Sequence, residues 1–224
     1  MKLLAVTLLA GAAAGCASSV TLEEARIPTP LTEKIPVSIG LRMPANFYDF
    51  SHEEEVYGRD VWSIDLGDAN ASLFRQLFGH MFTSVKVVSA DDDPASMGLD
   101  ALIEPSIDAF EFSVPAQSKT DAFAVWVRYR LKVYDRQGKL VSNWPVSAYG
   151  KSQTASVSNS EALQRAAVLA MRDAAALIIM KLEDATSIST IAAPPPVTAP
   201  AALETEVEGD VQTTAIEGPE DETG

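Results

Sequence analysis

The 224-residue chain contains a single cysteine, Cys16, and only two histidines, His52 and His80. One cysteine cannot close a disulfide within the chain, so packing must stabilise the fold. The histidines do not occur in an HExxH or comparable spacing, and the sequence lacks a GxSxG motif, a phosphate loop and a dinucleotide-binding glycine fingerprint. We therefore predict that the chain is not an enzyme and uses no metal and no cofactor.

Two acidic clusters are the remaining candidates for cation ligands. Asp91, Asp92, Asp93 and Asp100 could supply carboxylate oxygens, but the glycine and ligand spacing of an EF-hand loop is absent. A solvated acidic loop is the better interpretation of this cluster, and the same holds for the run Glu53–Glu55.

Basic residues are scarce, and the formal net charge is −14. After Thr186 there are eight acidic residues and no basic ones, whereas residues 17–185 contain 23 acidic and 16 basic side chains. A mildly acidic domain with an acidic tail has no electrostatic attraction for phosphate backbones. The composition therefore predicts that the protein does not bind nucleic acid.

No hydrophobic run is long enough to span a bilayer as a helix. The longest N-terminal run, Leu3–Ala14, follows Lys2 as in an export signal. Ala13, Ala14 and Gly15 precede the only cysteine, and small residues before a cysteine resemble the lipobox of bacterial lipoproteins, although leucine is commoner than alanine at the position of Ala13. An ordinary cleaved signal beside an incidental cysteine is the alternative.

The lipobox resemblance implies that Cys16 is acylated and becomes the mature N-terminus. Ala17 and Ser18 follow it, without the aspartate that often marks retention in the inner membrane. The resemblance therefore implies a lipid anchor in the outer membrane, with the protein on the periplasmic face.

Composition divides the chain into four parts. Residues 1–16 are the predicted lipoprotein signal peptide, and the polar, proline-containing residues 17–33 are a predicted tether. Residues 34–185 form one predicted α+β domain. Residues 186–224 are rich in proline, alanine and acidic residues and lack a hydrophobic period, so we expect a disordered tail.

The strongest secondary-structure signal is the alternating stretch Phe123–Tyr134. Its odd positions are apolar or aromatic, whereas its even positions include Trp126, Arg128, Arg130 and Lys132. This period of two predicts a strand with one face on the core. Asp135–Gly138 predicts a tight turn into a return strand over residues 139–152.

Two helices are predicted from apolar residues at helical spacing. The first contains Phe74, Phe78 and Phe82, preceded by Asp68 or Asn70 as a capping residue. The second follows Ser158, which forms a predicted capping box with Glu161. Further strands are predicted at 35–43, 85–89 and 101–114, with a short extra one at 61–66.

The fold class is therefore α+β: a mixed sheet of four to five strands with two helices packed on one face. The predicted order is strand, helix, strand, strand, strand, strand, helix.

This order, with the strings Arg130-Leu-Lys-Val-Tyr-Asp-Arg-Gln-Gly138 and Ala170-Met-Arg-Asp-Ala-Ala175, resembles small periplasm-facing lipoproteins of Gram-negative bacteria. That loose group includes the lipopolysaccharide-assembly lipoprotein of the outer-membrane translocon, lipoproteins of polysaccharide and curli export, and lipoprotein activators of peptidoglycan synthases. The group shares no catalytic motif. The resemblance implies a binding or scaffolding subunit of an envelope export or assembly machine.

Two function classes stay open. An interaction module would bind a protein partner in the envelope or a second copy of itself. A carrier would hold an apolar or glycan-like ligand between sheet and helices, and would need a roomy apolar concavity.

The candidate partner-binding residues are Trp126, Arg128, Arg130 and Lys132, a basic row with the residue types enriched in interface hot spots. The alternative is a solvated sheet face whose basic residues pair with Asp108 or Glu111 on an adjacent strand.

Overall fold

The computed structural model describes residues 17–22, 26–29, 33–58, 60–155 and 157–184. The chain divides into two units, residues 1–193 and 194–224, and every described residue belongs to the first. The predicted signal peptide with its lipobox and the predicted disordered tail lie outside the described residues. Within the described ranges, no helix has the length and apolar character needed to cross a membrane.

The elements are β1 (Ala17–Thr21), β2 (Ile35–Leu41), α1 (Ala45–Tyr48), β3 (Ser51–Val56), β4 (Asp60–Asp65), α2 (Gly67–Met81), β5 (Phe82–Val87), a 3-10 turn (Pro94–Met97), β6 (Ala101–Ser113), α3 (Pro115–Ser118), β7 (Ala122–Asp135), β8 (Leu140–Gln153) and α4 (Asn159–Asp184). They form a five-stranded sheet of order β5-β2-β6-β7-β8 and a three-stranded sheet of order β1-β4-β3. The predicted α+β class is confirmed. The order β2, α2, β5, β6, β7, β8, α4 of the larger sheet and its helices is the predicted one.

The larger sheet is mixed. β2 pairs in parallel with β5 and β6, whereas β6, β7 and β8 form an antiparallel meander. The β7–β8 turn contains Gly138 with φ +76°, and the Asp135 side chain accepts hydrogen bonds from the backbone N–H groups of Gln137 (3.0 Å) and Lys139 (2.8 Å). Aspartate and glycine thus fix the register of the two longest strands.

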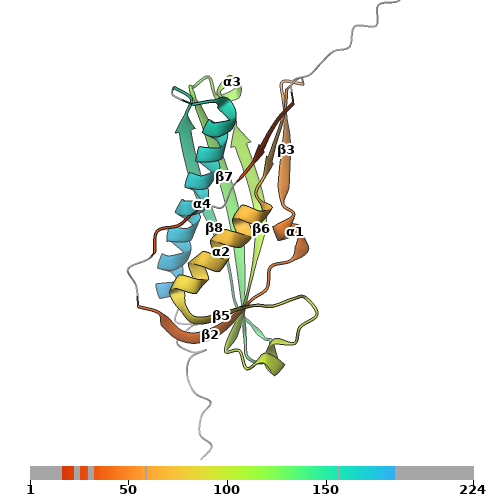
Figure 1. The fold of residues 1–224 in the computed structure, drawn as a ribbon, viewed down its shortest axis with the longest axis vertical. Coiled ribbons are helices and arrows are strands. Elements are labelled where there is room, and N and C mark those ends of the chain that lie inside the picture. The colour runs from red at the N-terminus through yellow and green to blue at the C-terminus, as the bar shows by residue number, and fades with distance from the viewer. Residues whose placement is uncertain (1–16, 23–25, 30–32, 59, 156, 185–224) are drawn as a thin grey trace, which may run out of the picture. The chain divides into compact units, whose positions relative to one another are not determined.

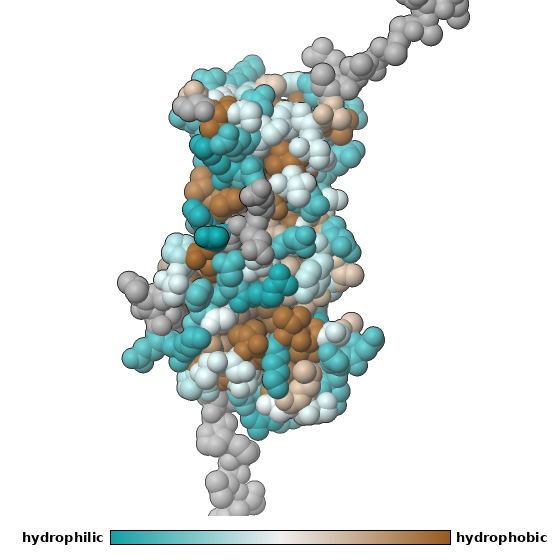
Figure 2. Space-filling model, in the orientation of Figure 1, coloured by the Kyte–Doolittle hydropathy of each residue, from teal (hydrophilic) through white to brown (hydrophobic). Residues whose placement is uncertain are grey.

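Both long helices cover one face of this sheet (Figure 1). Phe74 of α2 packs on Tyr129 of β7 with ring centroids 5.3 Å apart. α4 lies so close to Gly150 of β8 that a Cβ atom there would stand 2.0 Å from the carbonyl oxygen of Ala166. Figure 2 shows that this helix-bearing side carries mixed hydrophilic and hydrophobic residues, with a hydrophobic group in the region of β5.

The two helix starts differ from each other in capping. Ser158 Oγ accepts the N–H of Glu161 (3.2 Å), as the predicted capping box requires. The predicted caps of the first helix are wrong, because Leu66 occupies that position and Asp68 and Asn70 lie inside α2. Asn70 is buried and accepts a hydrogen bond from the Tyr129 hydroxyl at 2.5 Å.

The predicted tether at 17–33 is wrong at its start. Residues 17–21 form β1, which pairs in parallel with β4 from Ala17 opposite Val61 to Thr21 opposite Asp65. Leu22 is buried in the main core and donates its N–H to the carbonyl of Asp65 at 2.9 Å. Residues 17–22 are therefore part of the domain, although the predicted domain boundary lies at 34.

The acidic run Glu53–Glu55 is also not a loop, because it forms half of β3 and pairs antiparallel with β4. Tyr57 (φ +53°) and Gly58 (φ +66°) make the turn of this hairpin. His52 accordingly lies on a strand, where its ring contacts Phe110 (5.3 Å) and Phe112 (5.7 Å) of β6. The three-stranded sheet thus packs onto the same core as the helices.

Candidate partner-binding face

The face of β6, β7 and β8 that faces away from the helices is the candidate site, and we call it the partner face. β7 places Trp126, Arg128, Arg130 and Lys132 on it, since the alternate residues Val127 and Tyr129 are buried on the helix side. The structure therefore brings all four predicted residues together in one row. The predicted lipidation site Cys16, with Ala13, Ala14 and Gly15, lies outside the described residues.

One end of the larger sheet's helix-free side is covered by the loop after β5. Val88 and Leu99 are buried there against Leu102 of β6 and the half-buried Tyr134 of β7. Arg136 forms an ion pair with Asp100, whose other carboxylate oxygen accepts the N–H of Ser38 at 2.9 Å. These hydrogen bonds hold the pKa of Asp100 below its usual value. The loop leaves the Trp126 end of the partner face uncovered.

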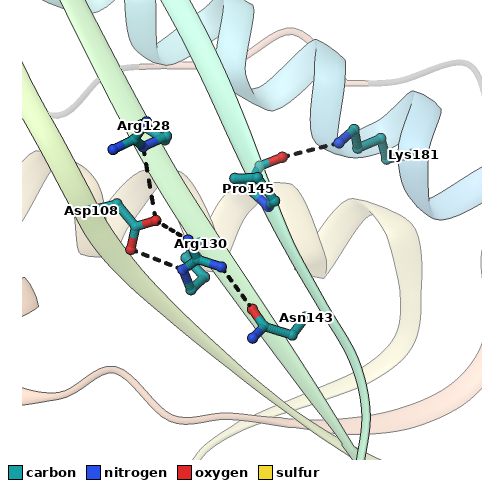
Figure 3. A network of polar contacts seen from close by, with 6 residues as sticks. All are labelled: Asp108, Arg128, Arg130, Asn143, Pro145 and Lys181. Atoms are coloured by element: carbon teal, nitrogen blue, oxygen red, sulfur yellow. Dashed lines mark hydrogen bonds and ion pairs between the residues drawn. The ribbon is translucent and has the colours of Figure 1, made fainter.

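The middle of the partner face is an ion-pair network around Asp108 (Figure 3). Arg130 contacts both carboxylate oxygens, at 3.0 Å and 2.5 Å, and donates to Asn143 Oδ1 at 3.2 Å. The Nε atom of Arg128 lies 3.9 Å from Asp108. The hydrogen bond from Arg130 lowers the pKa of Asp108 and raises the pKa of Arg130, so this pairing stabilises the fold above the ordinary carboxyl pKa and is lost as the pH falls through the lowered one.

A β-bulge explains why Asp108 reaches these arginines. Ile107 pairs with Tyr129 and Ala109 pairs with Arg128, which leaves Asp108 as the extra residue of β6. Such an insertion bends the strand and redirects a side chain. The pairing of Arg130 with Asp108 was one alternative of the sequence analysis, and the structure confirms it for the middle of the row.

Lys132 also forms an ion pair with a carboxylate of β6, at a longer distance. Its Nζ lies 3.9 Å from Glu104, which also pairs with Arg42, the residue directly after β2, at 2.9 Å. Arg130 and Lys132 are thus accounted for by contacts within the sheet. Water screens exposed ion pairs of this kind, so they add little stability. These two residues therefore act mainly as a charged surface that is already partly neutralised.

The uncovered end of the face carries an aromatic pair. Trp126 is 45% exposed and Tyr149 of β8 is 42% exposed, and their ring centroids are 5.1 Å apart. With Arg128 and Glu111 they form what we call the aromatic patch. The patch borders an open hollow of about 320 Å³ whose walls include Ala109, Glu111, Trp126, Arg128 and Ser147.

Tyr149 was missed by the sequence analysis, although a signal for it exists. Trp126 faces Tyr149 and Arg128 faces Ser147 in the β7–β8 register. If the residues of the two strands are paired outward from the turn that ends at Gly138, the sequence predicts these pairs to within about one residue. The small residues Ala109 and Ser147 also line the hollow. The sequence could not show this, because the bulge in β6 sets the register that brings Ala109 beside the rings.

The outer edge of β8 is occupied by side chains of α4. Asp173 accepts the N–H of Tyr149 at 3.0 Å, and Lys181 donates to the carbonyl of Pro145 at 3.0 Å (Figure 3). Occupied backbone groups and a proline disfavour the addition of a strand at this edge. A partner of this sheet would therefore use the side chains of the face rather than the edge.

The other candidate residues do not form a chemical centre. Asp92 accepts the N–H of Ser89 at 2.8 Å within its own loop. The His52 ring packs edge-on against Phe110 and Phe112, and its Nε2 lies 4.0 Å from a carboxylate oxygen of Glu54. Over the described ranges, no three His, Cys, Asp or Glu side chains come together as metal ligands.

The space that a carrier would use between α2 and the sheet is filled by aromatic rings. Phe74 and Phe78 are fully buried, with centroids 5.7 Å apart. A hollow of about 540 Å³ lies instead at the end of β2, where Met43, Tyr48 and Val87 meet Arg42 and Glu104. It is open to solvent and lies beside the sheet.

No family model matches the sequence, and no curated protein matches it. Several solved bacterial proteins are similar in structure. A minor lipoprotein from Acinetobacter baumannii is 12% identical, with 68% of this chain and 94% of that chain covered and a TM-score of 0.41. The uncharacterized lipoprotein B from Nitrosomonas europaea is also 12% identical, with 73% of this chain and 97% of that chain covered and a TM-score of 0.39.

A hypothetical protein from Chlamydia trachomatis is also similar, at 12% identity, with 65% of this chain and 96% of that chain covered and a TM-score of 0.39. At these identities and TM-scores, the likeness assigns no function to this chain.

Proposed function

We propose that the protein is a lipid-anchored, non-catalytic binding subunit of the cell envelope, which sits on the periplasmic face of the outer membrane and recognises a protein partner through the aromatic patch. The observation that carries the proposal is the exposed Trp126–Tyr149 pair on a sheet face that both long helices leave free. Tryptophan, tyrosine and arginine are the side chains most enriched in interface hot spots.

The charge of the face supports a protein partner with acidic groups. Arg128 is half exposed and its one contact with Asp108 is long, at 3.9 Å, so its guanidinium can form a bidentate pair with a carboxylate of the partner. The patch is thus an apolar pair beside an available cation, within a chain of net charge −14. This combination favours a specific protein surface over a second copy of the acidic chain.

The anchor is tested by replacing Cys16 with serine. The Cys16→Ser variant lacks the proposed attachment site for the acyl chains, and more than one chain is needed for stable anchoring. The variant is therefore expected to move from the membrane fraction to the soluble periplasmic fraction. The measurement is fractionation at high salt followed by immunoblotting. Retention of the Cys16→Ser protein in washed membranes would show that lipid on this residue is not the anchor.

The aromatic patch is tested by the double replacement Trp126→Ala with Tyr149→Ala. Loss of one hot-spot contact costs about 2 kcal/mol or more, which is about 30-fold in affinity. The acylated protein, extracted in mild detergent, is expected to sediment as a complex, and the variant as a single chain. Thermal melting checks that the variant is folded.

The matched control is Leu140→Ala with Val141→Ala, two exposed apolar residues at the other end of β8, which should leave the complex intact. If the folded aromatic variant sediments with the native complex, the patch is only solvated surface. A complex whose mass is a multiple of the chain would identify the partner as a second copy.

A further inference from the structure

A strand of the fold follows directly after the proposed lipid site. β1 starts at Ala17 and is held by five register pairs with β4. Consecutive Cα atoms are about 3.8 Å apart, whereas a flexible tether of about 17 residues would give a root-mean-square reach of about 23 Å. The link between the acylated residue and the folded domain is therefore one peptide bond.

The start of β1 defines one end of the domain. Ala17 lies opposite Val61, which also faces Glu55 next to the β3–β4 turn. In that turn the hydroxyl of Tyr57 donates to the carbonyl of Ala116 in α3 at 2.8 Å. We call this group, the start of β1, the β3–β4 turn and α3, the anchor end; it lies at the top of Figure 1.

We propose that the anchor end rests on the lipid headgroups of the membrane that holds the acyl chains, with Tyr57 at the interface. This inference rests on the lipid anchor proposed above. Tyr57 is 63% exposed and stands in the β3–β4 turn, where its φ is +53°. A tyrosine ring is amphipathic and favours the boundary between headgroups and acyl chains.

This orientation limits the class of partner. Trp126 is four residues from the start of β7 at Ala122, a span of about 13 Å at about 3.3 Å per residue. The far end of the same strand, at Asp135, is about 43 Å away by the same measure. The aromatic patch therefore lies close to the bilayer, and its partner is a protein embedded in that membrane or held at its surface.

The test uses two single-cysteine variants, Ala116→Cys in α3 and Gln137→Cys in the β7–β8 turn. Both positions are exposed, and the new thiol is the only free one because Cys16 is acylated. Each acylated protein is labelled with an environment-sensitive fluorophore and reconstituted in phosphatidylcholine vesicles that contain a lipid with a nitroxide near the headgroup. Vesicle flotation measures whether the protein is attached to the membrane. Fluorescence quenching measures how close each label lies to the headgroups.

We expect the label at residue 116 to be quenched several-fold more than the label at residue 137. Insertion of 16 glycine and serine residues between Cys16 and Ala17 should reduce quenching at 116 to the level at 137. Equal quenching without the insertion, or stronger quenching at 137, would overturn the orientation while leaving the anchor intact. Failure of both native-length proteins to float with vesicles would remove the anchor and this inference with it.

Discussion

Replacing Phe78 with alanine is expected to leave the domain close to unfolding. Phe78 is fully buried in α2, and its ring packs on Phe74 at 5.7 Å and on Phe82 at 5.9 Å. A buried Phe→Ala change costs about 3–5 kcal/mol, a large part of the about 5–15 kcal/mol that stabilises a domain of this size. Urea unfolding followed by circular dichroism measures the loss.

The control for this variant is Leu169→Ala, because Leu169 is 44% exposed on α4. Its truncation should change the free energy of unfolding by about 0.5 kcal/mol or less. A Phe78→Ala protein as stable as the control would mean that the rings of α2 do not hold the helix on the sheet.

Replacing Gly150 with alanine is expected to separate α4 from the sheet. A Cβ atom at this position would lie 2.0 Å from the carbonyl oxygen of Ala166 and 2.4 Å from the backbone nitrogen of Ala170. Both contacts are with helix backbone, so a rotamer change cannot relieve them. Overpacking in a dense core costs about 1–3 kcal/mol and occasionally more, which should appear as a lower Tm.

Gly79→Ala in α2 is the matched control, since a Cβ atom there meets no heavy atom within 4 Å. Alanine in place of glycine inside a helix stabilises by up to about 1 kcal/mol, so this variant should melt at or above the native temperature. A Gly150→Ala protein with an unchanged Tm would contradict the close packing of α4 on β8.

The larger sheet and its helices could be predicted from the sequence because their signals are local. The alternation around Tyr129, the aspartate and glycine of the β7–β8 turn and the Ser158 cap each act within a few residues. The alanines of α4 allow the helix to approach the sheet closely, as the structure shows above Gly150.

The predicted short strand at 61–66 is β4 of the three-stranded sheet, but its neighbours β1 and β3 were missed because their signals are not local. β1 is a five-residue, mostly polar strand in which only Val20 is buried, and its partner β4 lies more than 40 residues further along the chain. β3 is dominated by Glu53–Glu55, which have low strand propensity. The strand is held instead by non-local contacts, among them the hydrogen bonds to β4, the packing of His52 on β6 and the burial of Val56 in the core.

The row of partner-face residues was predicted from the sequence. Which of them are paired within the sheet and which are available to a partner was not. The sequence does not show that a bulge places Asp108 between Arg128 and Arg130. That pairing leaves Trp126 and Arg128 as the available residues of the row, and it needs Tyr149 from the next strand to complete the patch.

Site-specific photocross-linking in growing cells tests the central claim most directly. A photoreactive phenylalanine analogue is placed at Glu111, which faces Trp126 in the sheet, and separately at Gln137 in the distant β7–β8 turn. A partner bound at the aromatic patch predicts one discrete adduct from residue 111, none from residue 137, and loss of the adduct when Trp126 is replaced by alanine. No adduct from residue 111, or an adduct that persists in the Trp126→Ala background, would contradict the account.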